Sequence, residues 1–181
     1  MFRRLLIFFL IQNQLPTVEK KQQTTSKEQK RSVSTKVFIV HGHDSLAKTE
    51  VARIIEKLGL EAIILHEQAN QGKTVIEKFE RDASQVQFAI ILLTPDDVGY
   101  PKNKQDDAKP RARQNVILEL GYFSGILGRS NICVLYKEGV EIPSDYLGVV
   151  YIPYDKADAW KLGLGRELKQ AGMAIDMNKL I

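Results

Sequence analysis

From Lys36 onward, short apolar runs alternate with longer segments whose apolar residues recur at helical spacing. No other feature constrains the fold more, because this alternation is typical of a parallel sheet whose strands are joined by helices. The apolar runs predict five strands, at residues 37–40, 62–65, 88–93, 132–136 and 149–152. The intervening segments predict helices at about residues 45–58, from 74, at 113–127 and at 156–171.

The predicted helices carry recognisable end signals. Asp44 or Ser45 is the expected N-cap of the first helix and Gly59 the residue that ends it, whereas Thr74 and Glu77 predict a capping box at the second. A strand-first alternation of this size favours an α/β, flavodoxin-like fold: a five-stranded parallel sheet in the order 2-1-3-4-5 with helices on both faces. In such sheets, ligands bind where strands 1 and 3 end.

Composition narrows the class of protein further. A chain of 181 residues that is 44% hydrophobic and 27% charged is an ordinary globular chain with room for one domain. Its one cysteine, Cys133, lies inside an apolar run, which excludes a disulfide framework and a cysteine-ligated zinc site. We therefore expect a reducing, cytoplasmic setting.

Net positive charge is confined to the N-terminal end of the chain. Residues 1–36 carry eight Lys or Arg and two Glu, whereas the other 145 residues carry 18 basic and 20 acidic side chains. A domain that reads nucleic acid needs a basic folded surface. Nucleic-acid binding is therefore not expected.

The first 35 residues are expected to lie outside the domain. Leu5–Ile11 resembles the apolar part of a signal peptide but precedes no small-residue cleavage site, and seven apolar residues are too few to span a bilayer. A membrane-surface anchor, a weak export signal and an adventitious extension all remain open, and the last is favoured. Residues 17–35 are polar and lack aromatic residues, so they predict a disordered linker to a domain at 36–181.

Polar residues and a glycine follow the first predicted strand, at the edge where such sheets bind ligands. They are His41, Gly42, His43 and Asp44. Helix capping by Asp44 and a turn at Gly42 explain only part of this pattern, so we expect contact with a polar ligand as well. A metal site is not predicted, because the only further histidine, His66, lies beyond strand 2.

A second candidate ligand contact follows strand 2, at Gln68, Gly72 and Lys73. Gly72-Lys73-Thr74 resembles the end of a P-loop, but the P-loop pattern requires glycine where this chain has Glu67. A glycine and a lysine at a helix N-terminus still favour an anion such as a phosphate. A simple capped helix is the alternative.

Strand 3 leads into Thr94 and Pro95, where a phospho-receiver domain would need an aspartate. The polar loop at 99–112 is longer than most connections, and loops of this length are usually functional lids or disordered. Arg113, which begins the next predicted helix, is a further candidate ligand contact.

Glu119 is the candidate catalytic residue. A solvated helix face would show several charges near it, but its helical neighbours are Asn115, Tyr122 and Ile126. Glu119 is therefore predicted to be a partly desolvated acid that lines a crevice, an environment that tunes carboxylates for chemistry.

Residues 36–180 resemble the bacterial TIR-like domain proteins, predicted nucleotide-binding proteins related to TIR effectors of antiphage signalling systems. The resemblance rests on five stretches and the terminal MNKL: KVFIVHGHD (36–44), ILHEQANQGKTVIEKFE (64–80), FAIILLTPDDVG (88–99), PRARQNVILELGYFSGILGR (110–129) and LYKEGVEIPSDYLGVVYIP (135–153). These stretches cover nearly all of the predicted domain.

The resemblance implies a TIR fold and NAD⁺ glycohydrolase activity in antiviral defence, with NAD⁺ as substrate, no bound cofactor and activation by assembly with other TIR domains. It also implies a catalytic glutamate on the helix after strand 3, a position that only Glu119 matches. Many TIR domains have tryptophan four residues before this glutamate. This chain has Asn115 there, so the ligand contacts of that tryptophan do not transfer.

Two other functions remain open at this point. The domain could hold a nucleotide or pair with other TIR domains without turnover, or it could transfer a deoxyribosyl group, a reaction for which related sheets also use a glutamate. Nicotinamide release from NAD⁺ separates the first alternative from the hydrolase, and a deoxynucleoside supplied with a free base tests the second.

Overall fold

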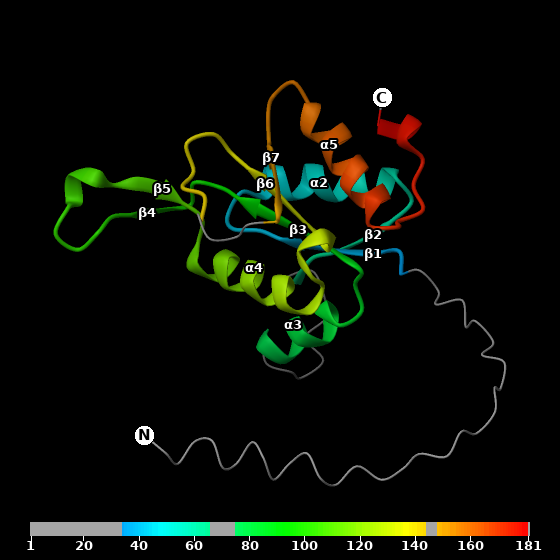
Figure 1. The fold of residues 1–181 in the computed structure, drawn as a ribbon, viewed down its shortest axis with the longest axis horizontal. Coiled ribbons are helices and arrows are strands. Elements are labelled where there is room, and N and C mark those ends of the chain that lie inside the picture. Colours follow the sequence, from blue (N-terminus) through cyan, green and yellow to red (C-terminus); the bar gives the residue numbers. More distant parts are fainter. Residues whose placement is uncertain (1–33, 66–74, 144–147, 181) are drawn as a thin grey trace, which may run out of the picture. The chain divides into compact units, whose positions relative to one another are not determined.

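The computed structural model describes residues 34–65, 75–143 and 148–180. Its main sheet has five parallel strands in the order β2-β1-β3-β6-β7, which confirms the predicted order (Figure 1). The strands are β1 (Lys36–Val40), β2 (Glu61–Ile63), β3 (Phe88–Leu93), β6 (Ile132–Tyr136) and β7 (Val150–Pro153).

Helices cover both faces of this sheet, as the alternating pattern predicts. They are α2 (Ser45–Lys57), α3 (Val75–Ala83), α4 (Gln114–Ile126) and α5 (Ala159–Gln170), with short 3₁₀ turns at Gln105–Asp107, Arg129–Asn131 and Met177–Leu180. Helices α2 and α5 pack on one face, and α3 and α4 pack on the other (Figure 1).

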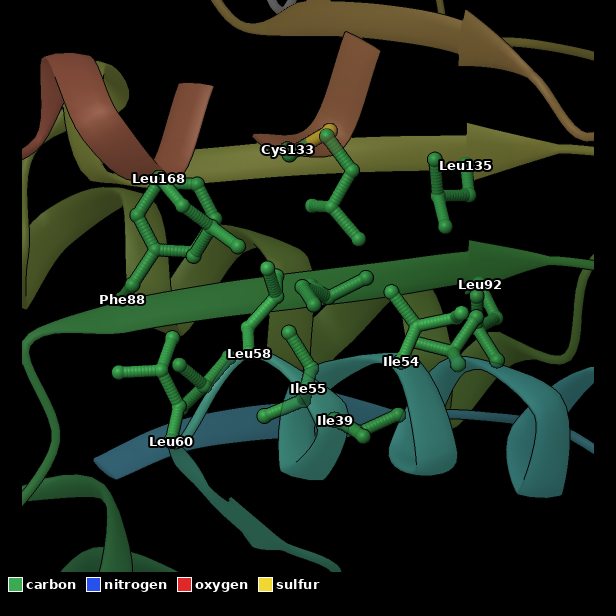
Figure 2. Packing of buried hydrophobic residues seen from close by; sticks show 14 of the residues in the cluster. Ile39, Ile54, Ile55, Leu58, Leu60, Phe88, Leu92, Cys133, Leu135 and Leu168 are labelled. Atoms are coloured by element: carbon green, nitrogen blue, oxygen red, sulfur yellow. The ribbon is translucent and has the colours of Figure 1, made fainter. Parts of the chain in front are cut away.

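The core divides into two layers because successive side chains of a strand point to opposite faces. In β1, Ile39 lies beside α2, as Figure 2 shows, in the layer that α2 and α5 share, whereas Phe38 packs under α3 and α4. All six residues of β3 are buried, as expected for a strand that is covered on both faces. The central strand β3 is therefore covered by helices on both faces, whereas the outer strand β7 is partly exposed.

The signals at the ends of α2 act as predicted. The Asp44 carboxylate accepts a hydrogen bond from the Ala47 amide at 3.0 Å, which caps the helix. Gly59 follows the helix with a φ of 85°, in the left-handed region that favours glycine. The capping box predicted at Thr74 lies outside the described residues, and α3 is described from Val75.

The last helix begins later than the sequence predicts, at Ala159 instead of about Lys156. Asp158, the residue before it, has a φ of 63°, so the chain turns through a left-handed conformation before the helix starts. The Asp155 carboxylate accepts hydrogen bonds from the amides of Ala159 and Trp160, and it satisfies the first turn from outside the helix.

The prediction of a loop at 99–112 is partly wrong, because the two ends of this segment form a hairpin. Strands β4 (Asp97–Gly99) and β5 (Lys109–Arg111) pair antiparallel and project from the main sheet (Figure 1). Three-residue strands produce almost no alternation signal, and Pro110 argued against a strand from the sequence alone. An ion pair between Arg111 and Glu141 at 2.8 Å ties the hairpin to the chain after β6.

Residues 1–33 lie outside the described residues, so the predicted extension and linker stay a prediction. Among the described helices, none combines the length and the apolar character that a membrane crossing requires.

Candidate functional site

The carboxyl ends of β1 and β3 lie side by side, since Val40 of β1 is paired with Ile91 of β3. Beyond these strands, Gly42 and Asp96 meet so closely that a Cβ on Gly42 would lie 1.7 Å from Asp96 Oδ2. The Thr94 hydroxyl donates a hydrogen bond to the same Oδ2 at 2.7 Å. A side chain at position 42 would therefore have to displace the Asp96 carboxylate, which fills that space.

Asp44 is held in place by its own partners. Besides capping α2, it forms a 2.5 Å ion pair with Lys137, which follows β6. Burial of Asp44 disfavours its ionised form, but the hydrogen bond from Ala47 and the charge and hydrogen bond of Lys137 outweigh burial and lower its pKa. This pair fixes the loop after β1 to the end of β6.

His43 and Arg113 come together from distant parts of the sequence. A hydrogen bond joins His43 Nε2 to the guanidinium of Arg113, the N-cap residue of α4. The neighbouring His41 contacts the Gly42 carbonyl through Nδ1 at 2.7 Å. The start of α4 therefore lies at the carboxyl end of β1, beside the loop that carries both histidines.

Glu119 lies on the flank of α4 that faces α3. Tyr122, one turn later on the same flank, packs on Phe79 of α3 with ring centroids 4.8 Å apart. Phe123 is fully buried against the sheet, and it anchors the helix beneath this flank. Asn115 lies one turn before Glu119 and is exposed.

The Glu119 carboxyl group is half-buried, and burial raises its pKa from 4.5 to about 7. Among the described residues, none forms an ion pair or a hydrogen bond with this carboxylate. The predicted partial desolvation of Glu119 is confirmed, whereas the crevice that it was expected to line stays a prediction. A group of this kind is poised to interact with positive charge that develops on a ligand.

The raised pKa of Glu119 predicts a pH dependence of stability. Below about pH 4.5, the carboxyl is protonated in the folded and unfolded states alike, so its burial carries no charge penalty. As pH rises through about 7, the unfolded chain has released this proton and the folded chain must ionise a buried group, so stability is lost over this window. Glu119→Gln should therefore melt above wild type at about pH 8 and close to it at about pH 5.

Thermal melts of both proteins at the two pH values check this prediction. Glu56→Gln is the matched control, because Glu56 is exposed on α2 and its replacement should change the melting temperature little at either pH. A melting difference for Glu119→Gln that does not change with pH would contradict the burial of this charge.

The structure brings together only part of the sequence-predicted site. His41, Gly42, His43, Asp44 and Arg113 surround the carboxyl end of β1, whereas Glu119 lies further along α4. Three further candidates, Gln68, Gly72 and Lys73, lie outside the described residues.

Sequence analysis missed Asp96 and Lys137. Both follow strands of the main sheet, β3 and β6, so their positions after apolar runs were the available signal. Their contacts with Gly42 and Asp44 cannot be predicted from spacing, because they join segments that are distant in sequence.

A cavity of about 860 Å³ is lined by Ala112 and Gln114, the two neighbours of Arg113 in the chain, but not by Arg113 or Glu119. It is bordered by β5, by the chain at 139–143 and by Gln114 and Ile117, which lie on the side of α4 opposite Glu119. Within the described ranges, no three His, Cys, Asp or Glu side chains gather in a way that could hold a metal ion.

The order of the sheet and the helices on both of its faces define a doubly wound, flavodoxin-like α/β domain, with a half-buried acid on the helix that follows β3 and the hairpin. Residues 36–156 match the family model described as "CAP12/Pycsar effector protein, TIR domain". The chain belongs to this family, which confirms the resemblance to TIR domain proteins of antiphage systems and the TIR fold.

Individual relatives agree with this family. The chain is 50% identical to YuaY of Escherichia coli K12, an uncharacterized protein, over 83% of this chain and 50% of YuaY. It is 38% identical to Protein tirC of Dictyostelium discoideum, over 66% of this chain and 64% of tirC. It is 31% identical to the Pycsar effector protein BcPycTIR of Burkholderia cepacia, over 76% of this chain and 44% of that protein. The chain thus spans about half the length of the curated relatives it matches.

Proposed function

We propose that this domain is an NAD⁺ glycohydrolase that cleaves the bond between ribose and nicotinamide, with Glu119 as its catalytic residue. The observation that carries the proposal is the half-buried Glu119 carboxylate, whose pKa burial raises to about 7. Membership of the TIR effector family supports the same chemistry.

The reaction suits a site with one carboxylate. NAD⁺ and water give ADP-ribose, nicotinamide and a proton, and the nicotinamide leaves a cationic pyridinium as a neutral molecule. No acid has to protonate this leaving group, so a second carboxyl is not needed. Glu119 hydrogen-bonds the ribose hydroxyls and stabilises the positive charge that develops on the ribose in the transition state, as carboxylates do in glycosidases.

Other residues in this proposal hold the rest of the dinucleotide. Arg113 and the loop after β1, with His41, Gly42, His43 and Asp44, contact NAD⁺ at the edge of the sheet. Asn115 and the segment with Gln68, Gly72 and Lys73 are further proposed contacts, the latter with a phosphate. NAD⁺ is a substrate here and not a bound cofactor.

The proposed setting is antiviral defence inside the cell, with activity switched on when copies of the domain assemble. The names of relatives as Pycsar effectors support the defence role. Assembly of TIR domains completes the site in this proposal, so an isolated domain is expected to be nearly inactive.

Nicotinamide release from NAD⁺ by concentrated protein tests the proposal. We expect release by the wild type, none above background by Glu119→Gln, and wild-type rates for the matched variant Glu56→Gln. NAD⁺ binding without release would indicate a non-catalytic nucleotide-binding or TIR–TIR interaction module. Transfer of a deoxyribosyl group from a deoxynucleoside to a free base would indicate a different enzyme.

A further inference from the structure

We propose that Asp96 is a specificity-determining residue that binds the 2′-hydroxyl of a ribose of the dinucleotide. This inference rests on the proposed function, because it takes NAD⁺ to be the ligand. It assigns a role to a carboxylate that lies at the ligand-binding edge of the sheet, after β3.

Three independent features fix the position of the Asp96 carboxylate. The Thr94 hydroxyl donates to its Oδ2 at 2.7 Å, and Thr94 is itself only 3% exposed. Gly42 leaves open the space that Oδ2 occupies. The Asp96 amide also bonds to the Thr94 carbonyl at 2.8 Å, which turns the chain tightly after β3. A carboxylate held in this way is preorganised to receive a ligand.

Structural roles account poorly for this carboxylate. Among the described residues, Thr94 is its one side-chain partner, and no cation forms an ion pair with it. Asp96 is half-buried, so its charge retains some contact with solvent and with anything that enters the site. By contrast, Asp44 on the other side of Gly42 is already engaged by Lys137 and by the start of α2.

The chemistry that fits a preorganised carboxylate at this edge is a vicinal diol. An ionised carboxylate only accepts hydrogen bonds, and ribose hydroxyls are donors. Rossmann-type dinucleotide-binding sheets also use an acidic residue for the ribose 2′-hydroxyl, although there it lies about 20 residues after the glycine-rich first turn. NAD⁺ contains two riboses, one next to adenine and one next to nicotinamide, and both present this group.

Binding of NAD⁺ and of its two single 2′-deoxy analogues, one for each ribose, tests the inference. The Glu119→Gln variant serves as the parent protein, because it stops turnover during the titration. We expect the parent to bind NAD⁺ at least about 10-fold more tightly than one of the analogues, since a charge-assisted hydrogen bond is lost. Adding Asp96→Asn should reduce this preference to less than about threefold.

Two further variants separate recognition from folding. Asp97→Asn removes the neighbouring carboxylate, which is exposed on β4, so it should keep the full preference. Thr94→Val keeps the side-chain volume but removes the hydroxyl that holds Asp96, so it should weaken the preference in the same direction. Thermal melts of each variant confirm that the titrated protein is folded.

The 2′-deoxy analogue that binds more weakly than NAD⁺ to the parent, but not to the Asp96→Asn variant, identifies the ribose that Asp96 binds. The inference is supported whether this is the adenine ribose or the nicotinamide ribose. If a folded Asp96→Asn variant keeps the preference of its parent, or if the parent has no preference, the inference is overturned. If the parent does not bind NAD⁺ even when it is forced to assemble by fusion to an oligomeric carrier, the inference and NAD⁺ as ligand both fail. Binding with the expected preference but no turnover by the wild type would leave Asp96 assigned and overturn the proposed hydrolase alone.

Discussion

Glu119→Gln is expected to lower NAD⁺ turnover at least about 100-fold, which corresponds to about 2.7 kcal/mol of activation barrier. Gln keeps the shape of the side chain but lacks the negative charge that stabilises the ribosyl cation. Folding should survive, because no described residue pairs with the Glu119 carboxylate, and removal of an unpaired, half-buried charge is neutral or mildly stabilising. Steady-state nicotinamide release and a thermal melt at about pH 8 measure the two effects.

The two measurements separate catalysis from a structural role. Lost turnover with an unchanged or raised melting temperature supports catalysis by Glu119. A structural ion pair would cost about 3 kcal/mol or more when broken. A lowered melting temperature with full activity per folded molecule would therefore make Glu119 structural and the proposed site wrong.

Phe123→Ala should lower the free energy of unfolding by about 3–5 kcal/mol, the largest change in stability expected for any of these variants. Phe123 is fully buried, and its ring centroid lies 4.9 Å from that of Phe38 in β1 and 5.5 Å from that of Phe79 in α3. Truncation would remove the aromatic contacts that hold α4 against the sheet and would leave a cavity beneath Glu119. Urea denaturation measures the loss.

Leu118→Ala is the matched control for this prediction. Leu118 lies on the same helix but is 70% exposed, so its truncation should change stability by no more than about 0.5 kcal/mol. Equal losses for the two variants would show that α4 is not anchored through Phe123.

The main sheet could be predicted from the sequence because each of its elements has a strong local signal. β3 is a continuous apolar run, and α2 has both a capping aspartate and a terminal glycine. The hairpin of β4 and β5 could not be predicted, since its strands are short and depend on contacts such as the Arg111–Glu141 ion pair. The late start of α5 likewise depends on the conformation of one residue, Asp158.

The candidate site could be predicted only in part, because several of its contacts join segments that are distant in the chain. The burial of Glu119 follows from the apolar character of its own helix, so spacing along α4 was enough to predict it. The pairing of His43 with Arg113, and of Asp96 with Gly42, joins segments that are distant in the chain. Such contacts are created by the sheet order, and the strand-end positions of these residues only indicate the edge at which they meet.

The most direct test of the proposed function is NAD⁺ turnover by the wild-type protein, measured with the domain free and with it forced to assemble by fusion to an oligomeric carrier. We expect nicotinamide release that rises strongly on assembly and that disappears in the assembled Glu119→Gln variant. NAD⁺ that is bound by the assembled wild type but stays intact, or release that is equal in wild type and Glu119→Gln, would contradict the proposed function.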